Sequence, residues 1–171
     1  MKCVPSALLV FLLAHRGAPP ARAADTPGAL HKRASAALAQ VEGEVKVAGL
    51  KGPVEVLRDR WGVPHIYAQN ADDLFFAQGF VAAQDRLFQI DLWRRAGVGE
   101  TAEVVGKEGL QADRIARLLK YRGDLGAEWA SYSPDARRIM TAFTNGINAY
   151  IDHIADRLPI TFQPGALRWT R

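Results

Sequence analysis

The sequence predicts an α+β fold that is mostly α-helical, with a few antiparallel strands toward its N-terminus. Two observations predict the helices: apolar residues recur every three or four positions in the second half of the chain, and glycine or proline separates these segments. A third observation predicts the strands, because residues 44–47, 54–58 and 65–68 are short apolar-rich stretches bounded by turn residues.

Residues 1–23 have the pattern of an export signal. Lys2 gives a positive start, residues 4–13 are mostly apolar, and Ala21-Arg22-Ala23 is a small-residue cleavage site, so we expect the mature chain to start at Ala24. The apolar run is too short for a membrane span, which needs about 20 residues, and a membrane anchor is therefore the weaker alternative. We expect a periplasmic or secreted protein with no membrane association after the signal is removed.

The charge balance changes when the signal is removed. The full chain carries 22 basic and 18 acidic residues. Lys2, Arg16 and Arg22 leave with the signal and no acid does, which leaves 19 basic against 18 acidic residues. No basic stripe with interleaved aromatic residues remains, so nucleic acid is not an expected partner. Cys3 also leaves, so the mature chain has no disulfide or thiol chemistry.

The N-terminal part of the mature chain predicts one helix and one strand pair. Residues 29–40 are rich in alanine and predict a short surface helix. The stretches 44–47 and 54–58 flank a turn at 49–53, and together they predict a small antiparallel pair.

A bend and a long helix follow. Gly62 and Pro64 force the bend, after which residues 65–68 predict a further strand. The long helix is predicted from about residue 73 to residue 95. We expect Asn70 or Asp72 to cap its start, Gly97 and Gly99 to end it, and Arg94 and Arg95 to suit the negative end of its dipole.

Two more helical segments are predicted after residue 109. Residues 110–132 predict helix with possible interruptions at Gly123 and Gly126, and Ser133-Pro134 predicts the start of another helix with Ser as cap and Pro as first residue. Residues 158–171 predict no helix or strand at the end of the sequence. The side chains expected to face inward are Leu110, Ile115, Leu118 and Leu119 in the first segment, and Ile139, Phe143, Ile147, Tyr150, Ile151 and Ile154 in the second.

The long helix combines two patterns. Its apolar side chains surround most of the axis, which predicts burial in something larger than the helix itself. Gln78, Asp85 and Gln89 form one narrow stripe with Arg86 on its flank, and we expect this stripe to face inward with partners, because an unpaired buried polar group is costly. Two interpretations stay open: the stripe fixes how the helix docks on the strands, which is the simpler one, or it contacts a substrate. The candidate partners of Asp85 are Arg58, Arg60 and Arg114.

The sequence predicts no catalytic, cofactor-binding or metal-binding residue. The mature histidines have no pair at metal-ligand spacing, and no serine lies in a nucleophile-elbow pattern. Gly97-Val98-Gly99 is too short for a phosphate-binding loop and follows a helix instead of a strand. Capping explains Asp72-Asp73 more simply than an acid/base pair or calcium site with Glu100 and Glu103. The histidines and serines concerned are His31, His65, His153, Ser35, Ser131 and Ser133.

An ordered set of motifs runs through residues 54–158. The motifs are Arg58-Asp59, Gly62-Val63-Pro64-His65-Ile66, Gly79-Phe80-Val81, Ala83-Gln84-Asp85-Arg86-Leu87-Phe88-Gln89, Ala102-Glu103-Val104-Val105-Gly106, Ser133-Pro134 and Gly146-Ile147-Asn148-Ala149-Tyr150-Ile151. In this combination they resemble the N-terminal part of the α subunit of the penicillin acylase family, which includes acyl-homoserine-lactone and cephalosporin acylases.

This resemblance implies an exported N-terminal-nucleophile amidohydrolase with an αββα fold. Family precursors cut themselves into an α and a β chain, and the new N-terminal serine of β attacks the acyl amide with its own α-amino group as base. Donors in β hold the oxyanion. The resemblance implies penicillins, cephalosporins or N-acyl homoserine lactones as substrates. It implies no cofactor in this chain, and calcium as possible in the complete enzyme.

The departures from the family pattern imply a missing partner. Family precursors are several times longer, their nucleophile lies in β, and their α-chain acyl pocket and calcium ligand lie beyond the position of Trp169. We therefore expect residues 24–171 to be a partial α-subunit domain from a truncated frame or gene fragment, inactive alone, with an exposed apolar patch that the β chain would cover. The alternative is a non-catalytic periplasmic helical binding or scaffold protein, or a degenerate acylase remnant.

Overall fold

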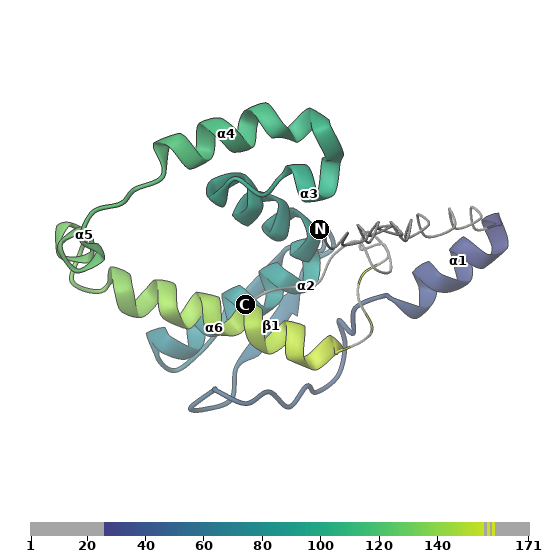
Figure 1. Ribbon diagram of the computed structural model, residues 1–171. Coiled ribbons are helices and arrows are strands. Elements are labelled where there is room, and N and C mark those ends of the chain that lie inside the picture. Colours follow the sequence, from purple (N-terminus) through teal and green to yellow (C-terminus); the bar gives the residue numbers. More distant parts are fainter. Residues whose placement is uncertain (1–25, 156, 158, 160–171) are drawn as a thin grey trace, which may run out of the picture.

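The computed structural model describes residues 26–155, 157 and 159 (Figure 1). The predicted export signal and all of the tail from residue 158 onward except residue 159 lie outside the described residues. The described part is mostly helical with one two-stranded antiparallel sheet, as the sequence predicts. In chain order the elements are α1 (Pro27–Ala36), β1 (Glu55–Arg58), β2 (Pro64–Tyr67), α2 (Ala71–Val98), α3 (Ala102–Val105), the 3-10 helix η1 (Gly106–Gly109), α4 (Leu110–Leu119), α5 (Leu125–Ser131) and α6 (Ala136–Ile154).

The surface helix α1 begins earlier and ends earlier than expected. Thr26 caps it by accepting a hydrogen bond from the amide of Ala29, and Pro27 occupies the first turn, where its missing N–H costs nothing. None of its residues is buried, which confirms a surface helix. The helix stops at Ala36, so Leu38, predicted to lie within it, lies beyond its end and is exposed.

The prediction that residues 44–47 pair with residues 54–58 is wrong. Residues 44–47 form no strand, and β1 instead pairs with β2, with Val56 opposite Ile66. The turn between the two strands explains the difference. Asp59 accepts hydrogen bonds from the amides of Trp61 (2.8 Å) and Val63 (2.9 Å), and Gly62 adopts a positive φ of 78°.

The start of the long helix α2 is fixed by carboxylate and amide side chains. Of the two candidate caps, Asn70 is the one that accepts from an amide, that of Asp73, at 2.9 Å. Asp73 is buried and accepts from the amides of Lys51 (2.9 Å) and Gly52 (3.1 Å), so it ties the loop before β1 to the helix. The hydrogen bond from Lys51 is the main reason why the pKa of Asp73 lies below its ordinary value.

Helix α2 continues past its predicted end. Gly97 lies within it, and Gly99 ends it in the left-handed region at a φ of 77°, where a side chain would be strained. In the middle of the helix, Arg86 has non-helical angles (φ −140°, ψ 28°), so the two halves meet at a kink.

The core lies between α2 and α6, which cross in contact (Figure 1). Their backbones approach closely because glycines face the contact: a Cβ on Gly79 would overlap the carbonyl of Phe143, and one on Gly146 would overlap the carbonyl of Phe76. The predicted inward face of α6 is confirmed in the second half of the helix. The buried apolar residues are Phe76, Ala77, Val81, Ala83 and Leu87 of α2 and Ile147, Tyr150 and Ile154 of α6, with Phe143 and Ile151 packed against the cluster.

The helices after α3 agree with the prediction only in part. Residues 110–132 form two helices, α4 and α5, separated by residues 120–124, so the interruption expected at Gly123 is confirmed, whereas Gly126 lies within α5. The four apolar side chains of α4 expected to face inward are exposed: Leu110, Ile115, Leu118 and Leu119. The reason is that α4 packs against the end of α2 through its polar face, as described below. Helix α6 begins at Ala136 with Asp135 as its N-cap, so Ser133 is not the cap, and its carbonyl instead accepts from the amide of Ala136 in a preceding turn.

Within the described residues, no helix is both long enough and apolar enough to cross a membrane.

Candidate functional site

Three of the six histidines and serines considered in the sequence have local structural contacts. His65 lies 3.5 Å from Asp59, the ring of His153 packs 6.0 Å from that of Phe80, and the hydroxyl of Ser131 donates to the carbonyl of Glu128. Within residues 26–155, no three His, Cys, Asp or Glu side chains come together as metal ligands.

The polar stripe of α2 does not face inward, contrary to the prediction. Gln78 and Gln89 are exposed. Asp85 is partly exposed and forms a two-pronged ion pair with Arg58, one of its three candidate partners, at 2.8 and 3.0 Å. Arg58 also donates to Gln84 at 2.8 Å. The prediction failed because the kink at Arg86 and the position of α6 decide which side of α2 is covered, and neither is visible in the spacing of polar residues.

The geometry favours the docking interpretation of Asp85 over contact with a substrate. Arg58 ends strand β1, so the ion pair joins the small sheet to the middle of α2. A hollow of about 160 Å³ lies beside it. Apolar residues line the hollow together with the polar residues Gln40, Glu42, Arg58 and Gln84, but the three stripe residues do not.

We expect Asp85→Leu to lower the free energy of unfolding by about 1 to 2 kcal/mol, because it removes both prongs of a partly buried charge-assisted pair. Urea denaturation of the full chain followed by circular dichroism measures this. Gln89→Leu is the matched control on the same helix and should change stability by less than about 0.5 kcal/mol. Equal stability of the Asp85→Leu chain and the wild type would show that the pair does not hold the sheet to α2.

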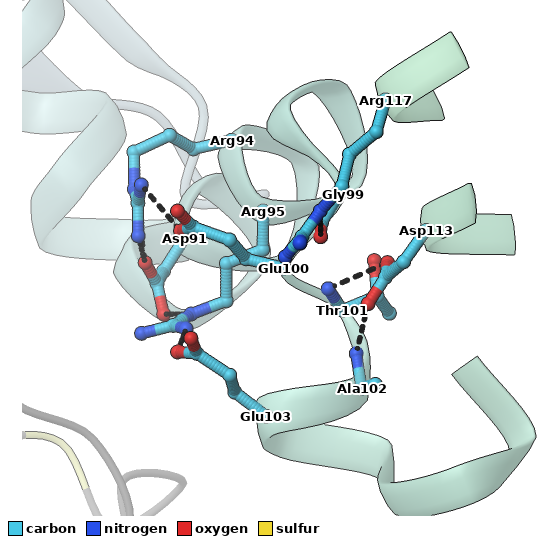
Figure 2. A network of polar contacts seen from close by, with 10 residues as sticks. All are labelled: Asp91, Arg94, Arg95, Gly99, Glu100, Thr101, Ala102, Glu103, Asp113 and Arg117. Atoms are coloured by element: carbon cyan, nitrogen blue, oxygen red, sulfur yellow. Dashed lines mark hydrogen bonds and ion pairs between the residues drawn. The ribbon is translucent and has the colours of Figure 1, made fainter. Parts of the chain in front are cut away.

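A network of charged side chains surrounds the C-terminal end of α2 (Figure 2). At its centre is Asp91, whose side chain is 1% exposed and accepts from Arg95 at 2.8 Å and from Arg94 at 3.1 Å. Arg95 is also buried and donates to Glu103 of α3, while Arg94 reaches Glu100 at 3.4 Å. Burial opposes the charge of Arg95, but its hydrogen bonds to Asp91 and Glu103 raise its pKa above the ordinary value.

This network assigns structural contacts to residues that the sequence left open or missed. Glu100 and Glu103 pair with arginines, so neither is a free acid/base group. Arg94 and Arg95 do more than interact with the helix dipole, because they connect α2 to the segment after it. Asp91 lies outside the predicted stripe. Its spacing of three and four residues from the two arginines is the signal that would have identified it.

Helix α4 is attached to this end of α2 by two polar side chains. Asp113 is buried and accepts from the amides of Thr101 and Ala102, both at 2.8 Å, at the start of α3. Arg117, one turn further along α4, donates from Nε to the carbonyl of Gly99 at 2.8 Å. Burial raises the pKa of Asp113, but the amides of Ala102 and Thr101 outweigh burial and hold this pKa below its ordinary value.

The attachment through Asp113 predicts acid sensitivity. Its folded pKa lies below the ordinary 3.8, so the stability it contributes is complete above that value and is lost as the pH falls through the lower folded pKa. We expect Asp113→Asn to lower Tm by several degrees at pH 7, and the gap from the wild type to shrink at pH 3. Thermal melts at both pH values measure this. Asp135→Asn, at an exposed position, is the control at pH 7, and a constant gap for Asp113→Asn would contradict the argument.

Together these features define a class: a mostly helical α+β segment that carries exposed apolar side chains. Its helix α2 is held to α3 by buried and partly buried ion pairs, and apolar side chains are exposed on its surface. The exposed apolar side chains include Trp93 on α2 and Leu118 and Leu119 on α4.

Comparison with known proteins supplies the family. Residues 53–170 match the family model described as penicillin amidase. The penicillin acylase 2 proenzyme of Pseudomonas sp. strain SE83 is 38% identical over 132 residues, which span 77% of this chain and 17% of that proenzyme. Penicillin G acylase of Escherichia coli is 39% identical over 101 residues (59% and 12%). Acyl-homoserine lactone acylase QuiP of Pseudomonas fluorescens strain Pf0-1 is 34% identical over 122 residues (71% and 15%).

The fold has a counterpart among solved structures. A thermostable penicillin G acylase from Alcaligenes faecalis is similar with a TM-score of 0.56 and 36% sequence identity, over 67% of this chain and 65% of that chain. The chain belongs to the penicillin amidase family. It matches only a segment of its relatives, 12% to 17% of the length of the three proteins named above.

Proposed function

We propose that this chain is the N-terminal part of the α subunit of an exported amidohydrolase that cleaves the acyl amide bond of β-lactams or N-acyl compounds. The observation that carries the proposal is the family match over residues 53–170, which includes the core helices α2 and α6. The names of the relatives, which include penicillin acylases and an acyl-homoserine lactone acylase, support this substrate class.

In this proposal the chemistry belongs to a β chain. The N-terminal serine of β attacks the acyl carbonyl, its own α-amino group takes the proton, and donors in β stabilise the oxyanion. The contribution of this chain is to position other elements. Helices α2 and α6 pack together and orient the elements around them, and the network around Asp91 fixes α3, which follows α2. The complete enzyme has the αββα fold, and the chain alone does not turn over substrate. Export by the signal at residues 1–23 places it in the periplasm or outside the cell.

A complementation assay tests the proposal. The full chain is produced with the polypeptide that remains when the matching segment is deleted from the penicillin acylase 2 proenzyme, and release of a chromogenic amine from a phenylacetyl or long-chain acyl amide is measured. We expect hydrolysis by the pair and none by the chain alone. Replacing the N-terminal serine of β by alanine should abolish hydrolysis by the pair.

Two outcomes would contradict the proposal. A stable but inactive pair would favour the scaffold or remnant alternative. Hydrolysis by the chain alone would show that it carries its own nucleophile.

A further inference from the structure

Helix α4 turns its apolar side away from the rest of the chain. At 100° per residue, Asp113 and Arg117 lie on one side of the helix, and both are bound to the segment at residues 99–102. Ile115, Leu118 and Leu119 lie on the other side, at the i, i+3 and i+4 positions that share a face. Leu118 and Leu119 are 74% and 76% exposed. We call Ile115, Leu118 and Leu119 the α4 face.

This orientation is the reverse of that in an ordinary surface helix, which buries its apolar stripe and exposes its polar one. Figure 1 shows that α4 runs along the side of the molecule away from α6, and that the link to α5 leads away from the core. Tyr121 on this link and Leu125 at the start of α5 are also exposed. Exposed apolar side chains that gather on one face, as Ile115, Leu118 and Leu119 do, mark an interaction surface.

The exposed charges of α4 and of residues 120–122 are basic, and the first exposed acid after them is Asp124, which caps α5. Arg114, Lys120 and Arg122 are exposed on or just after α4. The one acid within residues 110–122 is Asp113, which is buried and engaged with two amides. A partner complementary to this surface is therefore apolar at its centre and acidic at its rim.

A protein partner fits this surface better than a lipid surface does. Helix α4 has only ten residues, and its position is fixed by a buried carboxylate and a guanidinium, so it presents a small preformed patch. Lipid-surface helices depend on a large apolar face for their binding strength. Most of the length of the relatives lies outside the segment that this chain matches, which supplies polypeptide to cover the face.

We infer that the α4 face is where this chain binds the β chain of the proposed acylase, through a surface of β that is apolar with an acidic rim. The inference rests on the proposed function, because that function supplies the partner. It adds the place of binding and the chemistry of the surface that binds there.

The test measures the affinity of the full chain for the polypeptide remaining after deletion of the matching segment from the penicillin acylase 2 proenzyme. We expect Leu118→Gln/Leu119→Gln to weaken binding by about tenfold or more, since both side chains are exposed and glutamine keeps the helix propensity. Leu38→Gln is the matched control, because Leu38 is 78% exposed but lies outside α4, and it should change affinity less than about twofold.

The basic rim has its own test. Raising the salt concentration from about 0.05 M to about 0.5 M should weaken binding of the wild type more than binding of Arg114→Gln/Lys120→Gln. If salt weakened binding of the wild type and of the variant equally, the inference that the partner has an acidic rim would be overturned.

Unchanged affinity of the Leu118→Gln/Leu119→Gln chain, or no binding of the wild-type chain, would overturn the inference. Two other results would also overturn the inference. One is that the wild type binds phosphatidylglycerol vesicles in the absence of β and this variant does not. The other is that the wild type associates with itself and this variant does not. Hydrolysis of the acyl amide is recorded in parallel. A wild-type pair that binds through the α4 face but does not hydrolyse refutes the proposed function alone, whereas an active pair that is insensitive to the α4 variant refutes this inference alone.

Discussion

Gly146→Ala is expected to lower the free energy of unfolding by about 3 kcal/mol, at the upper end of the cost of overpacking a core. Gly146 lies on α6 where that helix crosses α2, and a Cβ there would overlap the carbonyl of Phe76 and lie 2.8 Å from the amide nitrogen of Phe80. These are backbone atoms of α2, so no side-chain rotation can relieve the overlap. The two helices must move apart, and the packing of Ile147 and Tyr150 against α2 is lost with that movement.

Urea denaturation of the full chain measures the effect, and α2 supplies the control. Gly97 is also a helical glycine, but its Cβ would meet nothing within 4 Å. Gly97→Ala should therefore be neutral or stabilising by up to about 1 kcal/mol, because alanine has the higher helix propensity. If both variants were as stable as the wild type, the close crossing of α2 and α6 would be refuted.

The packing of α6 against α2 also shows which parts of the fold the sequence predicts and which it does not. The spacing of Ile147, Tyr150 and Ile154 predicts the inward face of α6 because one helix carries the whole pattern. The contact of Gly79 and Gly146 with the opposite backbone was not predicted, because a glycine has no side chain whose pattern could signal it.

The candidate docking site was predicted less well than the core, for a physical reason. The pattern of Leu118 and Leu119 shows that α4 is amphipathic, but not which of its sides meets the chain itself. That choice depends on Asp113 and Arg117, whose partners are backbone groups of residues 99–102 and carry no sequence signature. The sequence predicted an exposed apolar patch on α2, whose residues are apolar around most of the axis, but it predicted that Leu118 and Leu119 face inward, which is wrong.

The second large effect is expected at Asp91, where Asp91→Leu should lower the free energy of unfolding by about 3 kcal/mol. Breaking a buried pair from one side leaves the other charge uncompensated, which costs about 3 to 5 kcal/mol, and Arg95 keeps Glu103 as a partial substitute, which favours the lower figure. Burial of the pair itself contributes little, because desolvation offsets most of the attraction. Asp91→Leu/Arg95→Met should therefore recover much of the loss.

A double-mutant cycle on the full chain, measured by urea denaturation, separates these contributions. Glu103→Gln is the control within the same network: Glu103 is 63% exposed, so its ion pair is screened by water and its loss should cost less than about 1 kcal/mol. A double variant that is less stable than Asp91→Leu alone would contradict the argument, because it would mean that Arg95 stabilises the end of α2 without its carboxylate partner. The affinity of the α4 face for its partner should also fall in Asp91→Leu, because Arg95 holds α3 through Glu103, and the amides of Thr101 and Ala102 at the start of α3 in turn hold Asp113 of α4.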